Sequence, residues 1–176
     1  MRPNPTLVAS ALLAGALLAH GCATVSSAAM VPENVRIERS LGGAVRVEAF
    51  GTPRQAWIGR SLVSGDELSR AVQQTVLEAG LFEEVAQLGE ADRVLMVEIE
   101  RLDEPGVGID QTCEVAMRWK LTSGDRSRTI WEELITTRKT VTSYDEIDSS
   151  LRAELAVQGA LEANLRRATM RLSNEG

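Results

Sequence analysis

The chain has 176 residues, of which 44% are hydrophobic and 25% charged, and its net charge is −6. Its Lys and Arg residues do not gather into the basic surface that neutralises phosphates, so we expect no nucleic-acid partner. A chain of this size can bury one ordinary hydrophobic core, which favours a single domain.

The N-terminal segment has the features of an export signal. Arg2 precedes an uncharged run of 13 residues, Leu7–Ala19, which is short for a bilayer core that needs ~20 helical residues. Gly21 followed by Cys22 resembles the lipobox, in which the cysteine is acylated and becomes the new N-terminus. We therefore expect a lipoprotein signal peptide at residues 1–21 and lipid attachment at Cys22. An ordinary secretory signal and a retained membrane anchor are the alternatives.

Residues 22–34 are small and polar and include Pro32, which predicts a flexible tether between the lipidated N-terminus and a single periplasmic domain at 35–176. Ala23 stands where an Asp retains lipoproteins at the inner membrane. Because this Asp is absent, the resemblance to bacterial lipoproteins implies export to the outer membrane, with the domain on its periplasmic face.

Only one cysteine, Cys113, is left after Cys22 is lipidated, so no disulfide can form within the mature chain. Cys113 belongs to an alternating apolar series that continues to Leu121. This pattern predicts a buried thiol, and the alternative is a disulfide to a second chain or a redox role.

Periodicity predicts the elements of the first half. Residues 35–37 and 45–49 alternate between apolar and charged side chains, as half-buried strands do. Ser64 and Glu67 have capping-box spacing and begin a helix whose apolar face reaches Ala79, with Gly80 placed as its left-handed C-cap.

The second half predicts strands at 94–102, 112–122 and 129–142, joined by the loop 104–111 and a turn at 123–125. A long amphipathic helix follows at about 150–172, with Leu151, Leu155, Gln158, Leu161 and Leu165 along one line. The order β-α-β-β-β-α predicts an α+β two-layer sandwich. We expect a mostly antiparallel sheet of about four strands, with both helices on one face.

The stretch from Gly51 to Leu165 resembles a family of small, uncharacterised lipoproteins of Gram-negative bacteria. The residues that carry the resemblance lie before the first helix, around the hairpin loop and in the last helix: Pro53, Trp57, Asp103, Pro105, Gly108, Asp110, Thr112, Arg152, Ala156, Gly159, Ala160, Asn164 and Leu165. The element order is also similar to that of the auxiliary lipoproteins of envelope lipid transporters and the lipopolysaccharide-assembly lipoprotein, a likeness of topology alone.

Little in the sequence points to catalysis. The only histidine, His20, lies in the signal peptide, so a mature chain has no imidazole for Ser-His-Asp or Cys-His chemistry or for a zinc site. Glu98 and Glu100 share one face of a strand, where two carboxylates could act as acid and base, but a solvated sheet face explains them as well. The acidic loop around Asp110 could likewise bind Ca²⁺ or simply form a turn. We expect no enzyme activity, no metal and no cofactor.

Five residues are candidates for contact with a partner or ligand: Trp57, Ile58, Arg152, Gly159 and Asn164. Trp57 and Ile58 are apolar residues in an irregular segment, which predicts either a cover for the sheet edge or a binding patch. Gly159 costs about 1 kcal/mol in a helix relative to Ala, so it indicates close packing or a partner lying against the helix.

These observations predict a non-enzymatic lipoprotein whose periplasmic domain acts by binding, as an accessory or assembly factor of the cell envelope. Its expected partners are the membrane, through the lipid, and an envelope protein. The alternative is a lipid- or glycan-binding domain with a small apolar pocket between sheet and helices, and a hydrolase that uses carboxylates is a third.

Overall fold

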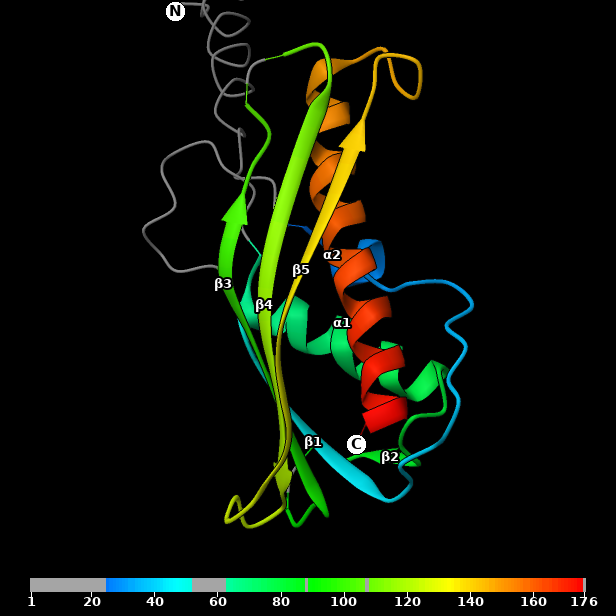
Figure 1. The fold of residues 1–176 in the computed structure, drawn as a ribbon, viewed down its shortest axis with the longest axis vertical. Helices are drawn as coiled ribbons and strands as arrows, with labels where there is room; N and C mark the ends of the chain where they lie inside the picture. Colours follow the sequence, from blue (N-terminus) through cyan, green and yellow to red (C-terminus); the bar gives the residue numbers. More distant parts are fainter. Residues whose placement is uncertain (1–24, 52–62, 88, 107, 176) are drawn as a thin grey trace, which may run out of the picture.

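The computed structural model describes residues 25–51, 63–87, 89–106 and 108–175, and Figure 1 shows two helices that cover one face of a single sheet. In chain order the elements are the short 3₁₀ helix η2 (Ser27–Ala29), β1 (Ala44–Phe50), α1 (Gly65–Glu78), β2 (Glu84–Val85), β3 (Arg93–Asp103), β4 (Gln111–Ser123), β5 (Thr129–Val141) and α2 (Ser149–Glu175). The predicted α+β class is therefore confirmed.

The sheet differs in detail from the prediction, because it has five strands in the order β2-β1-β3-β4-β5 and is mixed. β1 pairs in parallel with both β2 and β3, whereas β3, β4 and β5 are antiparallel. The crossover through α1 brings the chain back to begin β3 at the end of the sheet where β1 began, so these strands run parallel. β2 has only two residues, too few to give a periodic signal in the sequence.

The core lies between the sheet and the helices. The inward side chains of β4 are Cys113, Val115, Met117, Trp119 and Leu121, and none is more than 1% exposed. They confirm the predicted alternation and place the Cys113 thiol inside the core.

Local capping sets both ends of α1. Ser64 Oγ accepts a hydrogen bond from the Glu67 amide at 3.1 Å, as the capping-box spacing predicts. Gly80 adopts a φ of 69°, and the Leu81 and Gly80 amides donate to the carbonyls of Val76 and Leu77. This pattern is a Schellman motif, which needs the left-handed backbone that glycine adopts at low cost.

The segment predicted as a flexible tether is packed against the domain wherever the structure describes it. Val25 is 4% exposed and Met30 is fully buried. The amide of Ser27 donates to Glu67 Oε2 at 2.6 Å, so the Glu67 carboxylate binds this segment as well as the side chain of Arg70. From Val25 onward the chain is therefore packed on the domain, and the predicted flexible tether does not extend over these residues. Residues 35–37, predicted as a strand, form no regular element.

The first turns of α2 face the core differently from the prediction. Leu151 and Leu155 are 40% and 37% exposed, whereas Arg152 is 6% exposed and Ala156 is fully buried. Neighbouring residues of a helix point about 100° apart. Arg152 and Ala156, each one position after a leucine, therefore face inward, while Leu151 and Leu155 face outward. No helix in the described part of the chain is long and apolar enough to cross a membrane.

Candidate functional site

Asn164 lies at the centre of a buried polar cluster between α2 and the sheet. Its Oδ1 accepts from Trp119 Nε1 at 2.9 Å, and its Nδ2 donates to the Ile135 carbonyl at 2.8 Å and to Thr137 Oγ1 at 3.2 Å. Thr137 in turn donates to the Ala160 carbonyl at 2.7 Å. Asn164 is fully buried, so its side chain holds α2 onto β4 and β5 and is closed to the partner predicted for it.

Arg152 also serves the fold. Its Nη1 donates to the carbonyls of Glu146 and Ile147, at 2.7 and 2.5 Å. At 6% exposure the guanidinium satisfies carbonyls of the loop between β5 and α2, and the predicted surface contact is not available. Asp148 caps α2, because its Oδ1 accepts from the amides of Ser150 and Leu151 at 2.8 and 3.2 Å.

Gly159 is half-buried beside a lysine side chain. A Cβ at this position would lie 2.9 Å from Lys139 Cγ. The close neighbour is thus the stem of the Lys139 side chain on β5, which agrees with the close packing that the sequence suggested. Of the predicted contact residues that the structure describes, Gly159 is the one that borders a surface depression.

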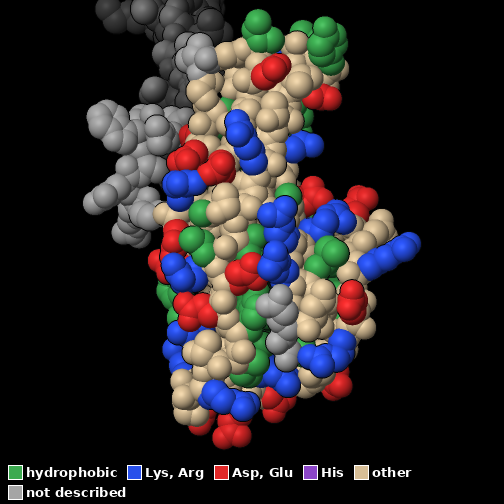
Figure 2. All heavy atoms as spheres, viewed as in Figure 1, with side chains coloured by type: hydrophobic (Ala, Val, Ile, Leu, Met, Phe, Trp, Pro, Cys, Tyr) green, Lys and Arg blue, Asp and Glu red, His purple; other side chains and the backbone are tan. Residues whose placement is uncertain are grey.

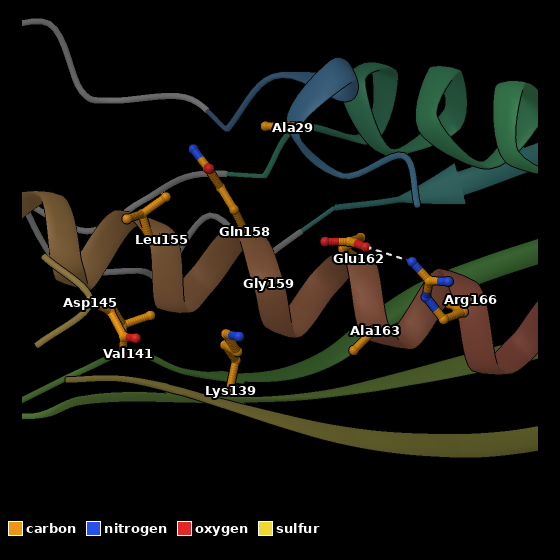
Figure 3. A pocket seen from close by; sticks show the side chains of 10 residues that line it. All are labelled: Ala29, Lys139, Val141, Asp145, Leu155, Gln158, Gly159, Glu162, Ala163 and Arg166. Atoms are coloured by element: carbon orange, nitrogen blue, oxygen red, sulfur yellow. Dashed lines mark hydrogen bonds and ion pairs between the residues drawn. The ribbon is translucent and has the colours of Figure 1, made fainter. Parts of the chain in front are cut away.

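That depression is an open groove of about 490 Å³ that runs along α2 next to β5 and η2 (Figure 3). Its lining residues are Ala29, Lys139, Val141, Asp145, Leu155, Gln158, Gly159, Glu162, Ala163 and Arg166. Two cationic and two anionic side chains line it, and one of each sign, Arg166 and Glu162, form an ion pair at 3.0 Å. The groove therefore has no charge preference of its own.

The predicted alternative of an apolar pocket between sheet and helices has no space at the point where α2 crosses the sheet. Trp119, Leu161 and Leu165, which meet there, are each at most 1% exposed. The groove lies beside this packed crossing, along α2 next to β5 and η2, and it is open to water.

The outer face of the sheet is charged and its charges are paired. Arg118 bonds Glu100 at 2.5 Å and Glu132 at 3.4 Å, and Lys120 pairs with Glu132 at 3.2 Å. Glu98 lies opposite Arg118 in the register of β3 and β4. The two carboxylates considered as an acid–base pair thus lie on a solvated surface beside a shared arginine. Among the described residues, no three His, Cys, Asp or Glu side chains gather as a metal site.

Burial raises the pKa of the Cys113 thiol to about 12, and the nearby carboxylates of Glu104, Asp103 and Glu114 add to the effect. Each pH unit below the pKa lowers the thiolate fraction tenfold. We therefore expect native Cys113 to react with iodoacetamide at least ~1,000-fold more slowly than a thiol of pKa 9.0. Mass spectrometry should find alkylation only after denaturation. Rapid labelling of the native chain, or a dimer lost on reduction, would show an accessible thiol instead.

Cys22, Trp57 and Ile58 lie outside the described residues, so their predicted roles stay predictions. The structure shows a different apolar surface, which we call the apolar tip: Ile109, Tyr144, Ile147 and Leu151, with exposed fractions of 75%, 100%, 90% and 40%. Figure 2 shows hydrophobic side chains at this end of the molecule. The sequence pattern did not predict this tip, because Leu151 falls on the apolar line of the predicted helix. The pattern Tyr-Asp-Glu-Ile-Asp at 144–148, apolar residues among acids in a loop, is the signal that could have revealed it.

No protein-family model and no curated protein matches the chain in sequence. Among solved structures, a DUF330 protein from Xanthomonas campestris is similar, with 15% identity and a TM-score of 0.59 over 83% of this chain and 95% of its own. The hypothetical protein CT253 from Chlamydia trachomatis has 10% identity and a TM-score of 0.55, over 76% and 97%. A minor lipoprotein from Acinetobacter baumannii has 7% identity and a TM-score of 0.48, over 74% and 92%.

The similar solved structures thus include a DUF330 protein and a lipoprotein of Gram-negative bacteria. At these identities the likeness to the two structures with the higher TM-scores shows the fold alone. The chain therefore has the fold of the Xanthomonas and Chlamydia proteins, a mixed sheet covered on one face by two helices.

Proposed function

We propose that the chain is a lipoprotein anchored through Cys22 to the periplasmic face of the outer membrane. In this proposal the α+β domain is not an enzyme and acts by binding, as an accessory or assembly factor of the cell envelope. The observation that carries the proposal is the short apolar run Leu7–Ala19 followed by Gly21-Cys22, with Cys22 three residues before Val25, the first described residue, which is buried.

Two features of the domain support a binding role. The interface between α2 and the sheet is filled by apolar side chains and the Asn164 cluster. A partner or ligand would therefore bind on the surface of the domain. That surface carries an apolar tip, and exposed apolar patches mark sites of interaction with a protein or a membrane. The expected macromolecular partner is a protein of the envelope, and the net charge of −6 gives no reason to expect a nucleic acid.

Metabolic labelling with palmitate, followed by membrane fractionation, tests the anchor. We expect the wild-type chain to be labelled and to sediment with the outer membrane, and Cys22→Ser to lose both properties, because acyl chains supply about 0.8 kcal/mol per buried CH₂. Cys113→Ser is the matched control and should keep the label. Ala23→Asp should keep the label but move the protein to the inner membrane. Label that persists in Cys22→Ser would contradict the proposal.

A further inference from the structure

The apolar tip is formed by two loops and the first turn of a helix that meet at one end of the molecule. The β3–β4 loop carries Ile109, the β5–α2 loop carries Tyr144 and Ile147, and α2 begins beside them (Figure 1). Gln111, where β4 begins, is paired in register with Val141, where β5 ends. The β3–β4 and β5–α2 loops therefore lie at the same end of the sheet. Three of the four tip side chains are at least 75% exposed, and removing such area from water is favourable by about 25 cal/mol per Å².

The start of the described chain lies close to this end of α2. Ala29, in η2, and Leu155, one turn after Leu151, line the same groove, and Figure 3 shows Ala29 beside Gln158 and Leu155. Leu151 and Leu155 are separated by about 6 Å along the helix axis. The outward leucines of α2 therefore connect the apolar tip to the segment that follows the anchor.

The chain between the anchor and the domain is short. Val25 is buried, and only three peptide steps join it to Cys22, a span of at most about 11 Å. A domain held this closely cannot swing freely away from the lipid surface. The domain therefore keeps one side close to the leaflet, and the exposed apolar residues at the end of α2 that adjoins η2 fit that side.

The charges around the apolar tip select the kind of lipid surface. Five acidic residues and no Lys or Arg occur in segments 104–112 and 142–151: Glu104, Asp110, Asp145, Glu146 and Asp148. Like-charge repulsion would oppose an anionic leaflet, whereas neutral zwitterionic headgroups carry no such penalty. Tyrosine at the rim of an apolar contact is also suited to a membrane interface.

We propose that the apolar tip inserts into the zwitterionic surface of the leaflet that holds the lipid anchor, so that the domain is fixed on the membrane at two points. This inference rests on the proposed anchoring at Cys22. Anchor and tip together would fix the orientation of the domain, with α2 leading away from the membrane and the charged sheet face exposed beside it.

Depth-dependent quenching in vesicles tests the insertion. The lipidated full chain carries Ile147→Cys with an environment-sensitive fluorophore, in phosphatidylcholine vesicles that contain nitroxide-labelled lipid. The matched control is Leu134→Cys, whose side chain is 45% exposed on the sheet; buried Cys113 does not take the label in the native chain. We expect loss of most of the fluorescence and a blue shift at position 147, no quenching at position 134, and weaker quenching at 147 when phosphatidylglycerol is added.

Equal quenching at the two positions, or none at 147 in a chain that floats with the vesicles, would overturn the insertion and leave the anchor intact. A chain that does not float lacks the anchor, and both proposals fail. A blue shift at 147 without vesicles that grows with protein concentration would mean that a second copy covers the apolar tip, which also overturns the insertion. Stronger quenching on added phosphatidylglycerol would contradict the choice of a neutral surface.

Discussion

Replacing Asn164 with alanine should lower the free energy of unfolding by about 2–4 kcal/mol. The truncation removes the bonds of Asn164 to the Trp119 indole N–H and the Ile135 carbonyl in a buried interface, and a buried polar group without a partner costs about 1–3 kcal/mol. Urea unfolding of the mature chain carrying Cys22→Ser measures the effect. In a domain of this size the Tm should fall by roughly 5–12 °C.

Gln158→Ala is the matched control for Asn164→Ala, because Gln158 lies on the same helix, is half-buried and donates a hydrogen bond to Glu154 in the preceding turn; we expect a change below about 0.5 kcal/mol. Trp119→Phe combined with Asn164→Ala should show coupling of about 0.5–3 kcal/mol, since the two side chains share one hydrogen bond. An Asn164→Ala chain that is as stable as the wild type would contradict the structural role and return Asn164 to the candidate contact residues.

Met30→Ala should destabilise the domain by about 2–4 kcal/mol, although Met30 lies in the segment that the sequence predicts to be a tether. Its side chain is fully buried in the core cluster, so the truncation loses apolar contacts and leaves a cavity. The same urea unfolding experiment measures the effect, and protease digestion should cut the variant faster near residue 30.

Arg36→Ala provides the comparison for Met30→Ala, because Arg36 is exposed in the same stretch of chain, and its loss should change the stability by less than about 0.5 kcal/mol. If Met30→Ala were as silent as Arg36→Ala, residues 25–34 would be the flexible tether after all. The short span to the anchor, on which the orientation at the membrane depends, would then be lost as well.

The packed N-terminal segment changes how the proposed anchor would act. With a tether of 13 residues, 22–34, the domain could sample many orientations above the membrane. With Val25 and Met30 buried, the chain is held by the domain from Val25 onward, three residues after Cys22. A binding protein held so closely presents the same surfaces to its surroundings at all times, which suits an accessory factor that meets a partner in a fixed geometry.

Several elements could be predicted because their signals are local. The cap at Ser64 and the left-handed Gly80 act on backbone groups within three or four residues, so their sequence spacing is sufficient. The inward series on β4 from Cys113 to Leu121 follows from period two alone. Both depend on chain neighbours and are independent of the rest of the fold.

The candidate site was predicted less well, because the roles of its residues depend on what lies opposite them. Arg152 and Asn164 are polar residues on a helix. The sequence cannot show that Arg152 bonds loop carbonyls and that Asn164 bonds the Trp119 indole inside the fold. Gly159 borders a groove, but the neighbour that explains it, Lys139, is distant in sequence. The apolar tip was not predicted, because Ile109, Tyr144 and Ile147 lie in loops without periodicity and Leu151 fits the apolar line of the last helix.

By itself, the sequence determined the class of the fold, the two helices, the long hairpins and the absence of any histidine after His20. Only the tertiary structure decided the parallel pairing of β1 with β3, the docking of Met30 and the rotation of the first turns of α2. The physical reason is the range of the interactions. Periodicity and capping act between neighbours, whereas pairing, docking and helix rotation are settled by contacts between distant segments that compete for the same core.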